Sequence, residues 1–286
     1  MKNTKKNISI EKLHPFENHP YKVQDNEEMD ALAESIKMHG VVSPIIVRPL
    51  ENTADEYEDE IISGHRRVMA SRKAGITEVP ALVVSLDRDE AAIVLVDSNL
   101  HREHILPSEK AFAYKMKAEA LAHKGYRTDL TSVQVAPKLA TEQIAEDAGT
   151  SKDTIKRYIR LTNLIPEILQ YVDDGRIAFT PAVELSYLNE QEQYDLLEQM
   201  ELNDCTPSLS QACRFKKMSG EEGLTPEVIA TVMSEEKANQ REMFKVPMER
   251  IRKYVPNANT KQAEDFVMKA CEHYRRYLIR QRDRER

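Results

Sequence analysis

Cysteine and long apolar runs are scarce in this sequence, and each shortage narrows the class of protein. The chain has 286 residues and 3 cysteines, Cys205, Cys213 and Cys271, at spacings that match no metal site. The 7 histidines other than His65, His19 among them, also lack ligand spacing and are expected in turns or at the surface. No window approaches the roughly eighteen apolar residues of a membrane span. The first residues, MKNTKKNISI, are basic but lack the apolar stretch of a signal peptide. We therefore expect a cytoplasmic protein with no membrane partner.

Positive charge is also in short supply overall. The chain has 41 Lys and Arg against 48 Asp and Glu, a net charge of −7. A protein with this balance does not coat nucleic acid indiscriminately, because non-specific affinity follows the number of phosphates that are neutralised. Any DNA binding must therefore come from a localised basic face. The length suits one large domain or two to three small ones, and no internal repeat is present.

Residues 7–106 mix short strands with helices, which predicts an α+β domain. Apolar residues at helical spacing predict a helix over 27–39 that ends at Gly40. Further helices are expected over 66–74 and 89–99, and strands over 8–13, 41–49, 60–62 and 79–86. The stretch 51–60 carries 6 acidic residues and no basic one, so we expect a solvated hairpin loop there.

Beyond Pro107 the strand pattern stops and helical periodicity continues. Ser108 is placed to cap a long helix. Residues 204–224 are rich in Asp, Pro, Ser and Gly and are interpreted as a linker. A further helix is expected from Pro226. The second half of the chain is therefore predicted to be helical.

The most informative segment is TEQIAEDAGTSKDTIKRYIRL, residues 141–161, whose spacing matches a helix-turn-helix. That motif needs a small residue where the helices touch, a glycine in the turn and a β-branched residue beneath the second helix. Ala145, Gly149 and Ile155 meet these needs. Thr141 and Ser151 are placed to cap the first and the second helix.

The outer face of that second helix is predicted to be exposed and largely basic. The residues expected to contact DNA are Ser151, Lys152, Asp153, Thr154, Lys156, Arg157 and Arg160. Such a face can read bases in the major groove of double-stranded DNA and hold phosphates. An ordinary helical hairpin with a charged surface is the alternative, but the three-point spacing favours DNA binding.

The stretch EIISGHRRVMASRKAG, residues 60–75, is a candidate phosphate site. A short strand runs into Gly64, and His65, Arg66 and Arg67 then begin a helix. Backbone N–H groups and the positive end of the helix dipole meet at such a turn. The two arginines can add bidentate contacts to phosphate oxygens. The alternative is a helix that begins with basic residues and binds no phosphate.

Several motifs occur together in a fixed order. They are "SIEKLHPFENHPYK", "ALAESIKMHGVVSPIIVRP", "IISGHRRVMASRKAGITEVPALVV", "SNLHREHILPSEKAFAY", the helix-turn-helix and "GRIAFTPAVELSYL". Over residues 7–200 the chain resembles the ParB family of DNA partition proteins. The resemblance implies an α+β N-terminal domain of the ParB/sulfiredoxin type, an all-α DNA-binding domain and a short helical C-terminal region. The expected domain bounds are 1–106, 107–203, 204–240 for a linker with a helix, and 241–286 for a dimerisation tail.

Family members are CTP-binding DNA clamps, so the resemblance implies a site for CTP with Mg²⁺. The implied nucleotide-binding residues are Lys22, Gly64, His65, Arg66, Arg67, Asn99 and Arg102. Asn99 is the residue expected to contact the magnesium ion. The turn at Gly64 supports phosphate binding on physical grounds as well.

Three departures from the family pattern affect the chemistry. His65 stands where the family usually has the glutamate of Gly-Glu-Arg-Arg. Ser98 stands where the second motif, Glu-Asn-x-x-Arg, has a glutamate linked to hydrolysis, although Asp97 beside it could substitute. The first motif, Asn-Pro-x-Gln-Pro-Arg, has become residues 18–23, with Lys22 near the glutamine position. We therefore expect CTP binding with slow hydrolysis at most, and we assign no catalytic residue.

The resemblance implies a partition protein that binds a centromere-like DNA site and works with a Walker-type ParA ATPase. It would act as a homodimeric clamp gated by CTP, on the nucleoid or a plasmid. A transcriptional or nucleoid-associated regulator of the same type is the alternative. An enzyme on the same N-terminal fold would need a cysteine or a catalytic carboxylate between Gly64 and Arg67, and the sequence has neither.

The C-terminal tail has an apolar stripe at helical spacing. Its residues are Ala263, Phe266, Val267, Ala270, Tyr274, Tyr277 and Leu278. The stripe could fold back on residues 243–254, but the family's habit of C-terminal dimerisation favours contact with a second copy. The last 15 residues hold 6 arginines and 3 acidic residues, a local basic patch able to touch phosphates.

Overall fold

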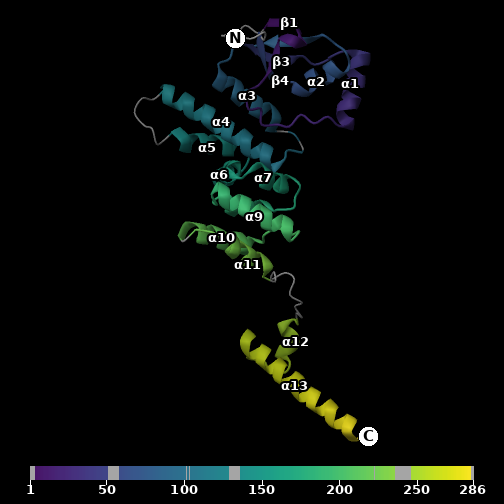
Figure 1. Cartoon of the computed structure of the whole chain (residues 1–286), viewed down its shortest axis with the longest axis vertical. Coiled ribbons are helices and arrows are strands. Elements are labelled where there is room, and N and C mark those ends of the chain that lie inside the picture. Colours follow the sequence, from purple (N-terminus) through teal and green to yellow (C-terminus); the bar gives the residue numbers. More distant parts are fainter. Residues whose placement is uncertain are drawn as a thin grey trace. The chain divides into compact units, whose positions relative to one another are not determined.

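The computed structural model divides the chain into two compact units, Met1–Glu235 and Glu236–Arg286 (Figure 1). It describes residues 4–50, 58–100, 102, 104–128, 136–221, 223–235 and 246–284. Most of the acidic stretch 51–60 thus lies outside the described residues. Among the helices that are described, none is both long and apolar enough to cross a membrane.

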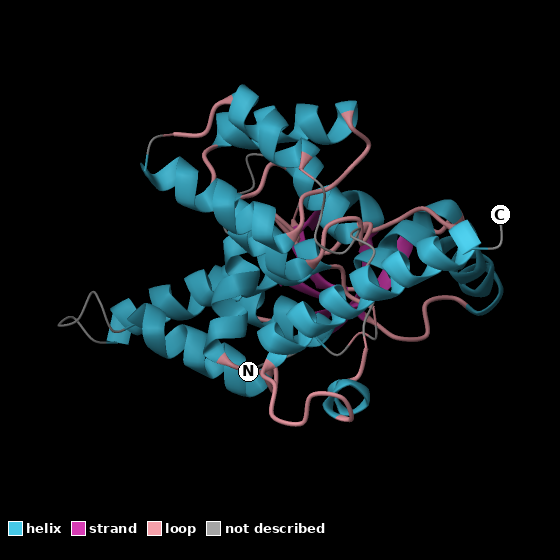
Figure 2. Ribbon diagram, turned by 90° about the horizontal axis from the view of Figure 1, so that it is seen from below, coloured by secondary structure: helices cyan, strands magenta, loops and turns pink. Residues whose placement is uncertain are grey.

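Five strands form one mixed sheet in the order β1-β5-β3-β4-β2. Their bounds are β1 Thr4–Ser9, β2 Leu13–Pro15, β3 Ile45–Pro49, β4 Asp59–Ser63 and β5 Glu78–Val83. Strand β3 runs antiparallel to β4 and parallel to β5, while β1 is antiparallel to β5 and β2 parallel to β4. Figure 2 shows these strands in magenta among the helices. One side chain cluster on the sheet includes Ile45, Val47 and Ile61, which are all buried.

Strand boundaries differ from the sequence-based ones for local reasons. The strand expected over 8–13 ends at Ser9, because a 3-10 turn over Ile10–Lys12 separates it from β2. Strand β3 starts at Ile45 rather than residue 41. The carbonyl groups of Ser43 and Pro44 accept hydrogen bonds from Arg67, so they are held by a side chain instead of a strand partner.

The acidic residues at the start of β4 are buried, so the expectation of a solvated loop is wrong for them. Asp59 is 2% exposed and Glu60 is 5% exposed. The Nζ of Lys6 lies 3.3 Å from Asp59 Oδ2, and the Nε of Arg48 lies 2.6 Å from Glu60 Oε2. Each carboxylate therefore has a cationic partner, as burial of a charge requires.

Three helices complete the N-terminal part and confirm the predicted ones. They are α1 Glu27–His39, α2 His65–Lys73 and α3 Arg88–Leu100. Helix α1 begins where the Asn26 side chain accepts from the Met29 N–H at 3.1 Å, and it ends at Gly40, whose φ is +72°. Helix α3 buries Leu95 and Val96 in a cluster shared with α4.

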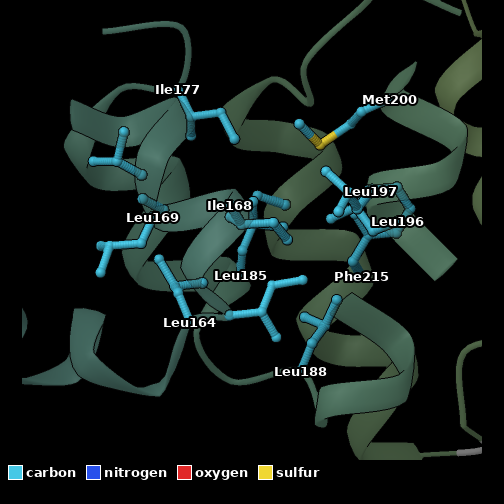
Figure 3. Packing of buried hydrophobic residues seen from close by; sticks show 14 of the residues in the cluster. Leu164, Ile168, Leu169, Ile177, Leu185, Leu188, Leu196, Leu197, Met200 and Phe215 are labelled. Atoms are coloured by element: carbon cyan, nitrogen blue, oxygen red, sulfur yellow. The ribbon is translucent and has the colours of Figure 1, made fainter. Parts of the chain in front are cut away.

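The rest of the first unit is helical. Its helices are α4 Pro107–Thr128, α5 Ala136–Asp147, α6 Lys152–Arg160, α7 Pro166–Asp173, α8 Phe179–Leu185, α9 Glu190–Leu202, α10 Leu209–Glu221 and α11 Pro226–Ser234, with a 3-10 turn, η2, over Leu161–Asn163. The core formed by the later helices contains Ile168, Leu185 and Leu196 (Figure 3).

The prediction of a linker over 204–224 is wrong for most of that range. Helix α10 occupies 209–221, and its Ala212 and Phe215 are completely buried. Figure 3 shows Phe215 within the core. Ser219 and Gly220, which suggested a linker, lie in this helix, because burial of its apolar face outweighs their weak helix propensity.

Two residues predicted to cap helices lie inside them. Helix α4 begins at Pro107, and the N–H and hydroxyl of Ser108 donate to the Asp173 carboxylate at 2.9 and 2.6 Å. Helix α5 begins at Ala136, so Thr141 falls in its second turn and is buried. The helices thus start upstream of the residues chosen from propensity.

The second unit contains α12 Met248–Arg252 and α13 Thr260–Arg284, which confirms the predicted tail helix. Ile251, Tyr254, Phe266 and Tyr274 line an apolar groove between the two helices. The segment before α13 therefore folds back on part of the stripe. Farther along α13, Leu278 remains 47% exposed.

Candidate functional site

Gly64 forms the turn between β4 and α2, and the close packing there requires glycine. Its φ is +108°, and a Cβ added to it would lie 2.7 Å from Ile45 Cγ2. The Val68 N–H donates to the Gly64 carbonyl at 3.0 Å and so begins the helix. The N–H groups of the first turn have no acceptor within the helix, so they are suited to bind an anion.

A cavity of about 640 Å³ opens at this turn. Its walls come from residues 19–23, α1, the β4–α2 turn and the end of α3. All the predicted nucleotide-binding residues line it: Lys22, Gly64, His65, Arg66, Arg67, Asn99 and Arg102. The volume lies in the range of small-molecule sites in proteins. The structure therefore brings together residues that are up to 80 positions apart in the sequence.

The two arginines of the turn differ in how they are held. Arg66 reaches across to α1, where its Nη2 donates to Glu28 Oε2 at 3.1 Å. Arg67 donates from Nη1 to the Ser43 and Pro44 carbonyls at 2.5 and 2.7 Å. Burial lowers the pKa of the Arg67 guanidinium from its ordinary value. Arg67 is thus a fixed cation whose hydrogen-bond partners are neutral carbonyl groups, so its positive charge can attract an incoming anion.

His65 is neutral, and its ring packs against that of His19 with 3.9 Å between the centroids and 46° between the ring planes. The Phe16 N–H donates to His65 Nε2 at 3.3 Å, so that nitrogen carries no proton. Burial, with added repulsion from His19 and Arg102, lowers the pKa of His65 to about 3. Burial also lowers the pKa of His19. A neutral ring at this position does not repel phosphate as a carboxylate would.

His19 was expected in a turn or at the surface, and Tyr21 was assigned no role, yet both line the cavity. His19 Nδ1 lies 2.7 Å from the Tyr21 carbonyl oxygen and donates to it. The Arg102 guanidinium lies 5.4 Å from the centre of the Tyr21 ring, a cation–π contact. Their position inside the first motif, residues 18–23, was the signal that could have found them.

The second motif places Asn99 in the wall with 6% exposure. Its Nδ2 donates to the Leu95 carbonyl at 2.8 Å, which leaves the amide oxygen as an acceptor. Ser98 Oγ also donates to Leu95, at 2.9 Å. Asp97 does not line the cavity and instead pairs with Lys117 at 2.6 Å, so it does not substitute for the missing glutamate.

Few side chains in the cavity could bind a magnesium ion. No group of three or more His, Cys, Asp or Glu capable of holding a metal occurs in the described part of the chain. The Asn99 amide oxygen offers one oxygen ligand. Mg²⁺ that enters with a nucleotide is commonly held by phosphate oxygens and waters with one or two protein ligands. The residues present fit an ion of that kind.

Lys22 lines the cavity, but its charge is paired outside it. Its Nζ donates to Asp173 Oδ2 at 3.1 Å and to Gln170 Oε1 at 3.3 Å, both on α7. Its backbone N–H donates to Glu109 Oε1 at 2.8 Å. The first motif is thus connected directly to the helical region.

Helices α5 and α6 form the predicted helix-turn-helix. Ala145 and Ile155 are buried between the helices, and Gly149 adopts a φ of +61° in the turn. Ser151 is the N-cap of α6, since its Oγ accepts from the Thr154 N–H at 3.1 Å. The predicted spacing and the second cap are confirmed.

The basic face of α6 is less free than expected. Ser151, Lys152, Asp153 and Lys156 are exposed and Thr154 is half-buried, whereas Arg157 and Arg160 are partly covered.

Contacts with α8 and the turn after it explain this covering. The Nη2 of Arg157 donates to Thr180 Oγ1 on α8 at 3.0 Å. Arg160 donates to the Ser186 carbonyl at 3.0 Å and lies 4.0 Å from the centre of the Tyr187 ring. The two arginines therefore also hold α6 in place.

Comparison with known proteins places these features in a family. The profile of the ParB N-terminal domain matches residues 1–100, and that of the ParB HTH domain matches 128–206. The nucleoid occlusion protein of Listeria innocua is 32% identical over 197 residues, which cover 68% of this chain and 62% of the relative. The chain thus spans less than two thirds of that relative's length.

Two solved structures of Caulobacter crescentus ParB, truncated at the C-terminus, are also similar. The one complexed to the centromeric parS site is 24% identical, covers 74% of this chain and 98% of that one, and has a TM-score of 0.41. The one complexed with CTP-gamma-S is 27% identical, covers 69% and 98%, and has a TM-score of 0.32. Since the two domain profiles match more than half of the chain in the expected order, this protein belongs to the ParB family.

Proposed function

We propose that this protein is a dimeric DNA-binding protein that takes up CTP with Mg²⁺ in its N-terminal cavity and binds a specific double-stranded site through α6. The observation that carries the proposal is the meeting of all the predicted nucleotide-binding residues around one cavity. The helix-turn-helix in the same compact unit supports a DNA partner.

Nucleotide binding is tested by calorimetry with the four ribonucleoside triphosphates and magnesium. CTP is expected to bind tightest. Arg66→Ala should weaken CTP binding about tenfold or more, because a charge-assisted contact to phosphate is lost. Arg72→Ala is the matched control, since Arg72 lies on the same helix but does not line the cavity. Equal, weak binding of all four nucleotides would reduce the site to an unspecific anion pocket.

DNA binding is tested by selecting sites from a random duplex library. We expect one preferred sequence for the wild type. Lys156→Ala should weaken binding to it by about 1–3 kcal/mol if the side chain reads a base, and by less if it holds a phosphate. Lys217→Ala is the control, an exposed lysine on α10. Failure to select any sequence would contradict the proposal.

We propose that hydrolysis of CTP is slow because Ser98 has no acidic group. Its hydroxyl can neither accept a proton from water as a carboxylate does nor bind magnesium as strongly. Ser98→Glu should therefore raise the rate of phosphate release in the presence of CTP, Mg²⁺ and the selected DNA. Brisk turnover by the wild type would show that the serine is no handicap.

Self-association through α13 is supported by the apolar side chains that the helix leaves uncovered. Tyr277, Leu278 and Ile279 are each about half exposed. Light scattering should give twice the chain mass for the full protein and the monomer mass for a chain ending at residue 235, the last of the first unit. A shortened chain that stays dimeric would remove this role from the tail.

DNA binding by this protein could serve either of two processes. A partition protein would stimulate the ATPase activity of a Walker-type ParA partner. A nucleoid-associated regulator would not, and the name of the Listeria innocua relative, a nucleoid occlusion protein, favours this second candidate. A Walker-type ATPase encoded beside this gene, and stimulated by the purified protein, would decide for partition.

A further inference from the structure

Asp173 is a buried carboxylate in an unfavourable place. It is the last residue of α7, its side chain is 2% exposed, and the C-terminal end of a helix disfavours negative charge. It is kept there by donors from elsewhere: the N–H and hydroxyl of Ser108 at 2.9 and 2.6 Å, and the Lys22 ammonium at 3.1 Å. Asp173 thereby caps the start of α4 from another helix.

Lys22 is the cationic member of this cluster and can reach two anions. Its side chain is 48% exposed and belongs to the wall of the nucleotide cavity together with Arg66 and Arg102. Its backbone is fixed by Glu109, whose other oxygen accepts from the Leu106 N–H at 3.0 Å. Only the flexible side chain therefore has to move for the ammonium to turn from Asp173 toward the cavity.

We propose that Asp173 and the nucleotide's triphosphate compete for Lys22, so that Asp173 is a positioning residue that restrains nucleotide binding. The inference rests on the proposed nucleotide site. A triphosphate carries several negative charges against one on Asp173, so it draws the ammonium into the cavity. Asp173 then keeps its Ser108 donors but loses its positive partner, which weakens the contact of α7 with the start of α4.

The move of Lys22 from Asp173 to the triphosphate can affect the DNA-binding face, because few residues separate the two. Asp173 precedes α8 by a few residues, and Thr180 on α8 accepts a hydrogen bond from Arg157 on α6. A loosened end of α7 therefore alters the support of α6. By linkage, DNA bound to α6 must change nucleotide affinity by the same factor.

The test is calorimetry of CTP with Mg²⁺ on the full chain. Asp173→Asn should bind CTP about three- to tenfold tighter than the wild type, because Lys22 is released while the amide still bonds to Ser108. Asp174→Asn is the matched control: the neighbouring carboxylate accepts from Gln170 and not from Lys22. Lys22→Met should weaken CTP binding, and adding Asp173→Asn to it should change nothing further.

A second measurement does not depend on the folding of the Asp173 variant. Hydrogen exchange at residues 106–110 and 166–174 should speed up when CTP is added to the wild type, and should not respond in Lys22→Met. Suppose that the wild type binds CTP, but that Asp173→Asn has the CTP affinity of Asp174→Asn or that CTP does not change hydrogen exchange. Either result would refute the proposed competition for Lys22 and leave the proposed nucleotide site unaffected. If the wild type binds no nucleotide, both proposals fall together.

Discussion

His65 should make the folded protein sensitive to acid. Its pKa is about 3 when folded, against 6.5 for an ordinary histidine. At neutral pH the ring is mostly neutral in both states and contributes little. As the pH falls below 6.5, the unfolded chain binds a proton that the folded chain refuses, so unfolding becomes more favourable. The loss grows until the pH approaches the folded pKa.

The expected loss is about 1.4 kcal/mol for each pH unit, or about 2 kcal/mol between pH 7 and pH 5. Because the folded pKa lies far below 5, the loss over this window depends on the unfolded value alone. His65→Gln removes the proton site and keeps an acceptor for the Phe16 N–H. Its free energy of unfolding should therefore fall about 2 kcal/mol less than that of the wild type over the same window.

Urea unfolding followed by circular dichroism measures this difference, since the chain has no tryptophan to report by fluorescence. His39→Gln, the same substitution at an exposed histidine on α1, controls for the chemical change. Carboxylates that lose their partners in acid affect all three proteins alike and cancel in the comparison. If the His65 variant loses as much stability as the wild type, the ring is not held neutral in the fold.

Two further changes test packing and charge. Gly64→Ala should destabilise the protein by about 3 kcal/mol through the contact with Ile45 and the positive φ, whereas Gly75→Ala, with a φ of +74° and open space, should cost only about 1 kcal/mol. Lys117 is 1% exposed and pairs with both Asp97 and Asp147. The double variant Asp97→Asn/Asp147→Asn should therefore lose about 3 kcal/mol or more of stability, and this loss should exceed the sum of the losses in the two single variants. Urea unfolding of the wild type, the two single variants and the double variant measures the difference.

Local patterns were enough to find most helices, the helix-turn-helix and the turn at Gly64, whereas Lys22, Asn99 and Arg102 were assigned through the resemblance to the ParB family. Helix α1 was predicted with the bounds that it has, because its apolar residues recur at helical spacing and Gly40 marks its end. The turn at Gly64 and the spacing of Ala145, Gly149 and Ile155 are local in the same sense. Turns, caps and short spacings can be recognised in a sequence because the residues that form them lie close together along the chain.

Contacts between distant residues could not be read in that way. Lys22 meets Asp173 across 151 positions, and no periodicity or motif connects them. Helix α10 was missed because its stability comes from burying Phe215 among other helices and not from its own composition. Arg157 and Arg160 were taken as free because the residues that accept their hydrogen bonds follow them by 23 and 26 positions.

The covering of those arginines bears on how the protein can hold DNA. Within α6, Lys152 and Lys156 are the exposed cations, and Lys152 lies 3.2 Å from Glu142. So few phosphate contacts per chain give weak binding with a shallow salt dependence, and the net charge of −7 adds repulsion. Two recognition helices on one site multiply their contributions. We therefore expect self-association through α13 to be a condition of stable DNA binding: the chain ending at residue 235 should lose site affinity far more than Lys156→Ala does, even with α6 unchanged.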